Sequence, residues 1–136
     1  MKKIIGLLLI LIATINFAVG QKVKASPRES VNGKINEAAI SIDYGSPSVR
    51  GRKIWGALVP FDKIWRAGAN EATTFKTDED IMIKGKKLPA GNYSLFIIPN
   101  EKECIVIFNK KTDQWGAYNY SQNLDQLRVK VLPNKQ

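Results

Sequence analysis

Short stretches of alternating apolar and polar residues, separated by turn-forming residues, dominate the chain after residue 36. The clearest stretch covers residues 37–44, in which Ile40, Ile42 and Tyr44 lie on one face and the residues between them on the other. A period of two residues is typical of a half-buried β-strand. The Gly-Ser-Pro-Ser run at residues 45–48 ends this strand, because Gly and Pro favour turns.

Further strands of the same kind follow toward the C-terminus. We expect them at residues 73–76, 80–84, 94–98, 103–108, 118–120 and 127–132. Nearer the N-terminus, Asn32-Gly33 predicts a tight turn. Short strands that recur between turns, with no helix of ordinary length beside them, predict an all-β fold, and specifically a single-domain antiparallel β-sandwich.

The segment from Leu88 to Tyr93 indicates how such a sandwich is connected. It places Leu, Pro and Gly just before a Tyr at the start of a strand. This order resembles the tyrosine corner of Greek-key sandwiches, in which the hydroxyl bonds to backbone a few residues upstream. We therefore expect a Greek-key topology, immunoglobulin-like or jelly-roll-like, with a buried hydrogen bond from Tyr93.

The first twenty residues follow a different pattern. Lys2 and Lys3 precede an apolar run from Ile4 to Ile15, and small residues at Ala18 and Gly20 close the segment. A short positive region, an apolar region and small residues before a cleavage point are typical of a secretory signal peptide. The apolar run is short for a membrane-spanning helix, which needs about 20 residues.

This leader sets the expected organisation of the chain. We predict a signal peptide at residues 1–20, a polar lead-in at residues 21–27 and the β-sandwich domain at residues 28–136. The mature protein would then be periplasmic or extracellular, with no stable membrane span after cleavage.

The net charge of the mature chain indicates which kinds of partner it favours. Removing Lys2 and Lys3 from the 21 basic residues leaves 19 against 12 acidic residues, a net charge of +7. Such an excess favours anionic partners. The basic residues are scattered, however, which is typical of a soluble surface. Export also argues against nucleic acid as the physiological target, so we predict no nucleic-acid partner.

Several kinds of catalytic chemistry have no support in the sequence. The chain contains no histidine, which removes the commonest general base and the commonest catalytic zinc ligand. It also lacks a Gly-x-Ser-x-Gly elbow, a phosphate-binding loop and a dinucleotide-binding fingerprint. We therefore assign no catalytic residue and predict neither a cofactor nor a metal site.

The richest polar cluster lies in the long irregular segment at residues 49–71. Arginine offers a planar fork of donors suited to carboxylates and phosphates. Tryptophan offers a flat face for sugar rings or cations. The segment therefore predicts a binding site for an anionic or sugar-like ligand, and long loops inside compact domains are often functional. The candidate ligand-binding residues are Arg50, Arg52, Trp65, Arg66, Asn70 and Glu71.

A structural role for the same residues is the alternative, and the sequence favours it slightly. In that interpretation Arg66 pairs with Glu71 or with a backbone carbonyl and locks the loop, while Trp55 and Trp65 fill the core. Buried arginine pairs are often structural in this way. The two interpretations differ in whether Arg66 is paired.

Three stretches resemble one known family. They run from Tyr44 to Arg52, from Ile64 to Thr73 and from Leu88 to Leu95, and the Trp-Arg-x-Gly-Ala-Asn-Glu run is their specific part. They are similar to secreted bacterial proteins grouped as "domain of unknown function 2911". The resemblance implies an exported β-rich domain and no established activity. Members often carry Arg where this chain has Ser46, which would weaken an anion site built from the family's arginines.

These observations together favour an exported binding or structural module over an enzyme. A small hydrolase that acts on envelope or dietary glycans is the alternative. Such an enzyme would need two opposed carboxylates, for which Asp43, Asp62 and Glu71 are the candidates.

Overall fold

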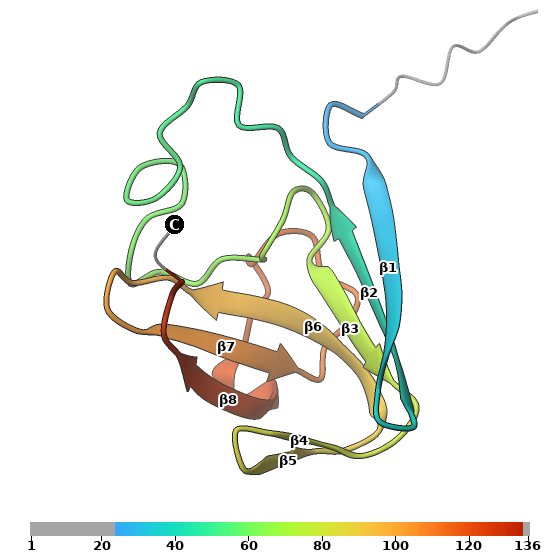
Figure 1. Ribbon diagram of the computed structural model, residues 1–136. Helices are drawn as coiled ribbons and strands as arrows, with labels where there is room; N and C mark the ends of the chain where they lie inside the picture. The colour runs from blue at the N-terminus through green and yellow to red at the C-terminus, as the bar shows by residue number, and fades with distance from the viewer. Residues whose placement is uncertain (1–23, 135–136) are drawn as a thin grey trace, which may run out of the picture.

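Antiparallel β-strands make up the regular structure of the protein, as a computed structural model shows for residues 24–134 (Figure 1). The predicted signal peptide and the first part of the lead-in lie outside these described residues. The strands are β1 (Arg28–Ile35), β2 (Ala38–Gly45), β3 (Thr73–Thr77), β4 (Ile81–Ile83), β5 (Lys86–Leu88), β6 (Gly91–Ile98), β7 (Cys104–Asn109) and β8 (Asp125–Val131), with one short 3-10 turn, η1 (Gln122–Leu124).

Six of these strands form one twisted sheet in the order β1-β2-β3-β6-β7-β8, and β4 and β5 form a separate hairpin. Every pairing is antiparallel. The prediction of an all-β antiparallel fold is confirmed. The order within the large sheet is that of a meander into which the β4–β5 hairpin is inserted. It differs from the expected Greek key, in which a long connection returns a strand to lie beside an earlier one.

The β1–β2 hairpin turns four residues later than the sequence indicated. Asn32 and Gly33 lie inside β1, opposite Ser41 and Ile40 of β2. The turn falls at Asn36, which adopts the left-handed conformation with φ 53°. Asn tolerates this conformation and two-residue hairpins require it, so an Asn without a following Gly was sufficient here.

Apolar clusters lie on both faces of the large sheet. On one face the β4–β5 hairpin contributes Ile81 and Leu88 to a cluster with sheet residues such as Phe75 and Phe108. This second layer gives the fold its sandwich-like core. On the other face Phe96 and further residues of β6 and β7 pack against irregular segments. The faces alternate along each strand, because successive side chains point to opposite sides.

The expected hydrogen bond of Tyr93 is present. Its hydroxyl donates to the carbonyl oxygen of Pro89 at 2.8 Å, and the side chain is buried. Gly91 leaves space for the ring, since a Cβ there would lie 3.1 Å from the hydroxyl oxygen. Burial also raises the pKa of Tyr93. The local motif was therefore predicted correctly, although the sheet around it is a meander.

Tyr93→Phe should lower the free energy of unfolding by about 1–3 kcal/mol, because it leaves a buried carbonyl without a partner. Denaturant unfolding of both proteins measures this. Tyr118→Phe is the control, since Tyr118 is 84% exposed and its hydroxyl faces water. Equal unfolding midpoints for wild type and Tyr93→Phe would show that the bond contributes no stability.

A buried polar cluster joins the β7–β8 connection to the sheet. Asp125 accepts hydrogen bonds from the Tyr120 hydroxyl at 2.7 Å and from the Asn109 amide at 2.8 Å. It also pairs with Arg128, with 3.2 Å between Nε and Oδ2. Burial, together with the bond to Asp125, raises the pKa of Tyr120 to about 12. The cluster fixes where the connection leaves and re-enters the sheet.

Candidate functional site

The connection between β2 and β3, residues 46–72, is the longest irregular segment between described strands, and we call it the site loop. Figure 1 shows it at the end of the sheet, away from the β4–β5 hairpin. It is tied to the sheet by a pair of backbone bonds. Trp65 N–H donates to Ile97 O at 2.8 Å, and Ile97 N–H donates to Trp65 O at 2.9 Å. Trp65 thus takes the place beside β6 where β3 has not yet begun.

Two glycines let the site loop lie directly on the end of β2. Ala69 N–H donates to the carbonyl of Gly45 at 3.1 Å. A Cβ at Gly45 would lie 2.1 Å from the carbonyl oxygen of Ala69, and a Cβ at Gly68 would lie 2.9 Å from the carbonyl oxygen of Gly45. Only residues without a side chain permit this backbone contact. The contact holds the segment that carries Arg66 and Asn70 against the end of β2.

The segment around Arg66 also contains strained backbone. Ala67 and Asn70 both adopt left-handed conformations, with φ 57° and 63°. Thr73 closes the segment by donating its N–H to Arg66 O at 3.2 Å and its hydroxyl to Ala67 O at 3.0 Å. An alanine in this conformation costs about 1–3 kcal/mol and persists only where its surroundings enforce it. Strain of this kind concentrates at functional sites.

A second segment, from the β7–β8 connection, supports the site loop from the side. Ala72 N–H donates to Gln114 O at 2.9 Å, and Gly116 N–H donates to Asn70 O at 3.0 Å. Gly116 also lies near the Arg66 guanidinium, since a Cβ there would be in ordinary contact with Nη1 at 3.6 Å. Sequence reasoning missed this contribution, which comes from about fifty residues further along the chain.

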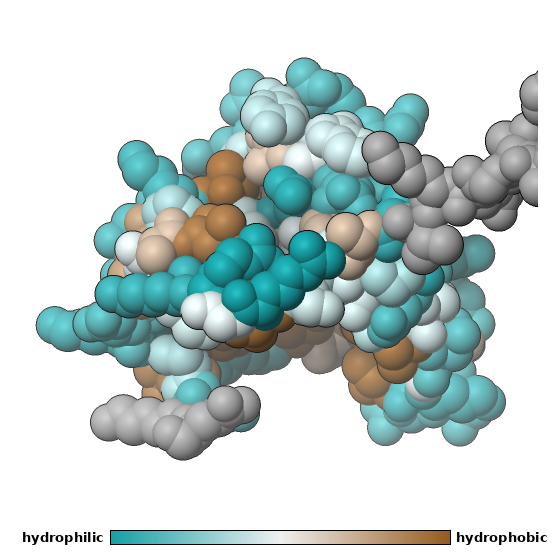
Figure 2. Space-filling view, turned by 90° about the horizontal axis from the view of Figure 1, so that it is seen from above, coloured by the Kyte–Doolittle hydropathy of each residue, from teal (hydrophilic) through white to brown (hydrophobic). Residues whose placement is uncertain are grey.

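An open pocket of about 580 Å³ lies along the site loop, and we call it the Arg66 pocket. Figure 2 views this end of the molecule and shows apolar residues at the surface between hydrophilic ones. The lining residues are Ser26, Pro47, Ser48, Val49, Arg52, Ile54, Trp55, Leu58, Val59, Trp65, Arg66, Gly68, Ala69 and Asn70.

Four of the six residues predicted from the sequence meet in this pocket: Arg52, Trp65, Arg66 and Asn70. The other two do not line it. Arg50 donates to Ala25 O at 3.4 Å. Glu71 accepts from the ammonium of Lys24 at 3.0 Å. A bond to its own backbone N–H, followed by the bond to Lys24, lowers the pKa of Glu71.

The expected pairing of Arg66 with Glu71 is therefore wrong. Within residues 24–134 no carboxylate lies within ion-pair distance of Arg66, and its Nε is buried without a hydrogen-bond partner. The segment that Thr73 closes turns Glu71 outward, where Lys24 meets it. A buried donor without a partner is costly, so its presence beside a pocket marks a place where an acceptor would be stabilised.

The two other long polar side chains of the pocket already donate to backbone carbonyls. Arg52 donates through Nη2 to Ser48 O at 2.8 Å and through Nε to Val49 O at 3.0 Å. Asn70 donates its amide to Ser26 O at 3.3 Å. These bonds hold the rim of the pocket in shape. Arg66 is thus the cation that has no partner among the described residues of the lining.

Aromatic rings form one wall of the Arg66 pocket. Trp55 and Trp65 meet edge to face, with ring centroids 5.6 Å apart. Trp55 is 52% exposed, so the expectation that it fills the core is wrong. It belongs to a tight turn at residues 54–59, in which Val59 N–H donates to Ile54 O at 2.9 Å and Gly56 N–H donates to Val59 O at 3.0 Å. No sequence pattern indicated that the aliphatic residues of this turn line a pocket.

The model of one protein family, "Protein of unknown function (DUF2911)", matches residues 26–136. The chain belongs to the DUF2911 family. This confirms the resemblance carried by the three sequence stretches. No curated protein and no solved structure matches the chain. The function of this DUF2911 protein must therefore be argued from its own site.

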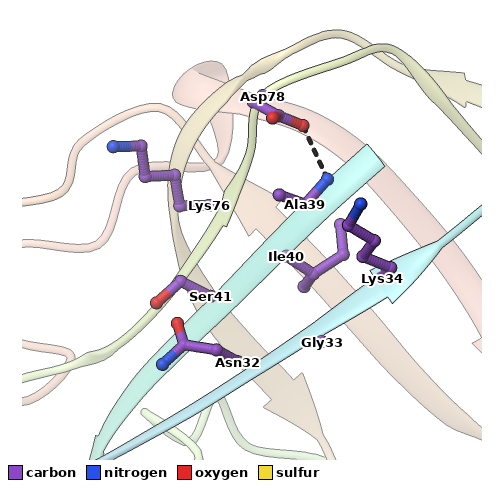
Figure 3. Close-up of a pocket in the computed structure, with 8 residues that line it drawn as sticks. All are labelled: Asn32, Gly33, Lys34, Ala39, Ile40, Ser41, Lys76 and Asp78. Carbon is purple, nitrogen blue, oxygen red and sulfur yellow. Dashed lines mark hydrogen bonds between the residues drawn. The ribbon is translucent and has the colours of Figure 1, made fainter. Parts of the chain in front are cut away.

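A second hollow of this DUF2911 protein lies on strands β1, β2 and β3 (Figure 3). Its one lining carboxylate, Asp78, already accepts the backbone N–H of Ala39 at 2.7 Å. Its two lysines, Lys34 and Lys76, sit on strands on either side of β2. The hollow therefore has no converging set of free polar groups, and we place the candidate site in the Arg66 pocket.

Two further properties of the DUF2911 chain concern residues 24–134. No cluster of three or more metal-ligating Cys, Asp or Glu side chains occurs in this part of the chain. Nor does this part hold a helix with the length and apolar character to cross a membrane.

Proposed function

We propose that this DUF2911 protein is an exported binding module that holds an anionic ligand in the Arg66 pocket. The observation that carries the proposal is the buried Nε of Arg66, which has no partner beside a pocket of about 580 Å³. A guanidinium cannot lose its charge at physiological pH, and that of the half-buried Arg66 has no ion-pair partner among the described residues, so an anion in the pocket would be stabilised. The leader at residues 1–20 supports export.

The way in which the pocket is built supports binding rather than a purely structural role. Backbone bonds from Ile97, Thr73 and Gly116 hold the site loop in place without help from the Arg66 side chain. The loop is thus preorganised around a charge that it does not itself neutralise. Preorganisation of this kind lowers the entropy cost of binding.

The hydrolase alternative has less support. No carboxylate lines the Arg66 pocket within the described residues. Asp62 accepts from the amide of Asn100 at 2.7 Å, and Glu71 is turned toward Lys24. A glycoside hydrolase of the usual kind needs two carboxylates facing one another across the substrate. The described residues offer no such pair at the pocket.

Arg66→Ala should abolish anion binding while leaving the fold intact. We expect at least one of phosphate, acetate and glucuronate to bind the wild type, and the variant to bind it at least about tenfold more weakly, because a charge-assisted hydrogen bond is lost. The free energy of unfolding should change by less than about 1 kcal/mol, since no ion pair is broken. Calorimetric titration and denaturant unfolding measure the two effects.

Arg50→Ala is the matched control, because Arg50 belongs to the same loop but does not line the pocket. It should bind anions like the wild type. If Arg66→Ala instead loses several kcal/mol of stability, or binds anions unchanged, Arg66 is a structural residue and the proposal is wrong.

A further inference from the structure

The Arg66 pocket combines one free charge with walls that are mainly apolar, and this combination restricts the ligand further. Among the described residues Arg66 is the lining cation without a partner, since Arg52 already donates to two loop carbonyls. A single guanidinium fork matches a carboxylate, which it binds through two parallel hydrogen bonds. A phosphate dianion spreads its charge over three oxygens, and one fork leaves part of it unpaired.

The rest of the lining favours a ligand with an apolar body. Ile54, Leu58 and Val59 face the pocket together with the rings of Trp55 and Trp65. Leu58 is 54% exposed and Trp55 52% exposed in the free protein. Covering these surfaces with an apolar group would remove them from water, which is favourable in proportion to the area buried.

A sugar fits the lining of the Arg66 pocket less well than an apolar body does. A pyranose carries a hydroxyl on most of its carbons, and each hydroxyl that leaves water needs a hydrogen-bond partner in the site. The Asn70 amide already donates to Ser26 O, and the Arg52 guanidinium is held by Ser48 and Val49. Tryptophan rings could stack on a sugar or on an apolar ring alike. The aliphatic side chains of Ile54, Leu58 and Val59 favour the apolar ring, because they offer no hydrogen bond to a hydroxyl.

We infer that the ligand of the Arg66 pocket is a small carboxylic acid with an apolar, ring-sized or branched body. This inference rests on the proposed anion-binding function and adds the class of ligand to it. The carboxylate accepts from Arg66, and the body lies between the Trp55 ring and the aliphatic residues of the turn at residues 54–59. A volume of about 580 Å³ is within the range of pockets that hold small molecules.

The test is a calorimetric titration of the full mature chain with four probes. They are 3-phenylpropanoate, its uncharged amide, glucuronate and inorganic phosphate. We expect 3-phenylpropanoate to bind at least about tenfold more tightly than each of the other three probes. It alone has both a carboxylate for Arg66 and an apolar body for the apolar lining. In Arg66→Gln, 3-phenylpropanoate should bind no more tightly than its amide, since glutamine keeps a polar N–H near the position of Nε but carries no charge.

A second variant tests the walls. Leu58→Ser should weaken the binding of 3-phenylpropanoate about threefold to tenfold and leave any binding of phosphate unchanged. Leu132→Ser is its control, because Leu132 is 74% exposed and lies outside the lining. Both leucines are at the surface, so neither change should prevent folding.

The outcomes separate this inference from the proposed function. If glucuronate or phosphate binds as tightly as 3-phenylpropanoate and depends on Arg66, the ligand class is wrong but the anion site stands. If none of the probes binds, or if binding does not depend on Arg66, both are wrong. Equal effects of Leu58→Ser and Leu132→Ser would also overturn the assignment of the walls.

Discussion

Gly45→Ala should destabilise the protein by about 3 kcal/mol or more and abolish ligand binding. The new Cβ would lie 2.1 Å from the carbonyl oxygen of Ala69 and 2.9 Å from its carbonyl carbon. Both atoms belong to backbone, so no side-chain rotation can relieve the overlap, and overpacking without relief is costly. The site loop would have to lift away and lose the bond from Ala69 N–H to Gly45 O.

Gly33→Ala provides the matched control. Gly33 is also in a strand, in β1, but a Cβ there would meet no atom within 4 Å. Gly33→Ala should leave the free energy of unfolding unchanged or raise it by up to about 1 kcal/mol, because alanine restricts the conformations of the unfolded chain. Denaturant unfolding of both variants gives the comparison. A Gly45→Ala protein that unfolds at the wild-type midpoint would show that the contact between β2 and the site loop is not tight.

Asp125→Ala is expected to lower the free energy of unfolding by about 2–4 kcal/mol. Its carboxylate is the shared acceptor of Tyr120 and Asn109 and the ion-pair partner of Arg128. The Asp125 side chain is only 6% exposed, so water cannot replace it fully. Removing one member of a buried network leaves the other members without partners, which costs more than the bonds themselves contribute.

Glu103→Ala is the control for the loss of an acidic ion pair. Glu103 pairs with Lys130 at 2.9 Å, but both side chains are largely in water, so its removal should cost less than about 1 kcal/mol. Thermal or denaturant melts of the two variants would measure the difference. Similar stabilities for Asp125→Ala and Glu103→Ala would mean that the buried cluster contributes little to the fold.

The sequence predicted the strands best where one face of a strand is buried. The alternation at residues 37–44 matches β2, because its apolar positions face the core. The alternation is lost where a strand has no buried face. Strand β1 is exposed along its whole length, so nothing marked it as a strand and Asn32-Gly33 looked like a turn. Residues 118–120 were expected to be a strand, but they belong to the irregular β7–β8 connection.

The candidate site was predicted in its residue types but not in its pairings. The Trp-Arg-x-Gly-Ala-Asn-Glu run identified Trp65, Arg66 and Asn70 as candidates because they are close in sequence. The partner of Glu71 is Lys24, far away along the chain, and the carbonyl of Asn70 is held by the N–H of Gly116. Such contacts arise from the tertiary fold, and a local pattern carries no information about them.

The turn at residues 54–59 has a consequence for how binding preference can change over evolutionary time. Its backbone bonds close within the turn itself, whereas Arg66 is positioned by bonds to β3, β6 and the β7–β8 connection. Replacing Ile54 or Leu58 can therefore reshape the pocket without disturbing the charged anchor or the sheet. Two related proteins with the same anchor can then accept ligands with different bodies, so selectivity can diverge while the fold and the anchoring chemistry stay the same.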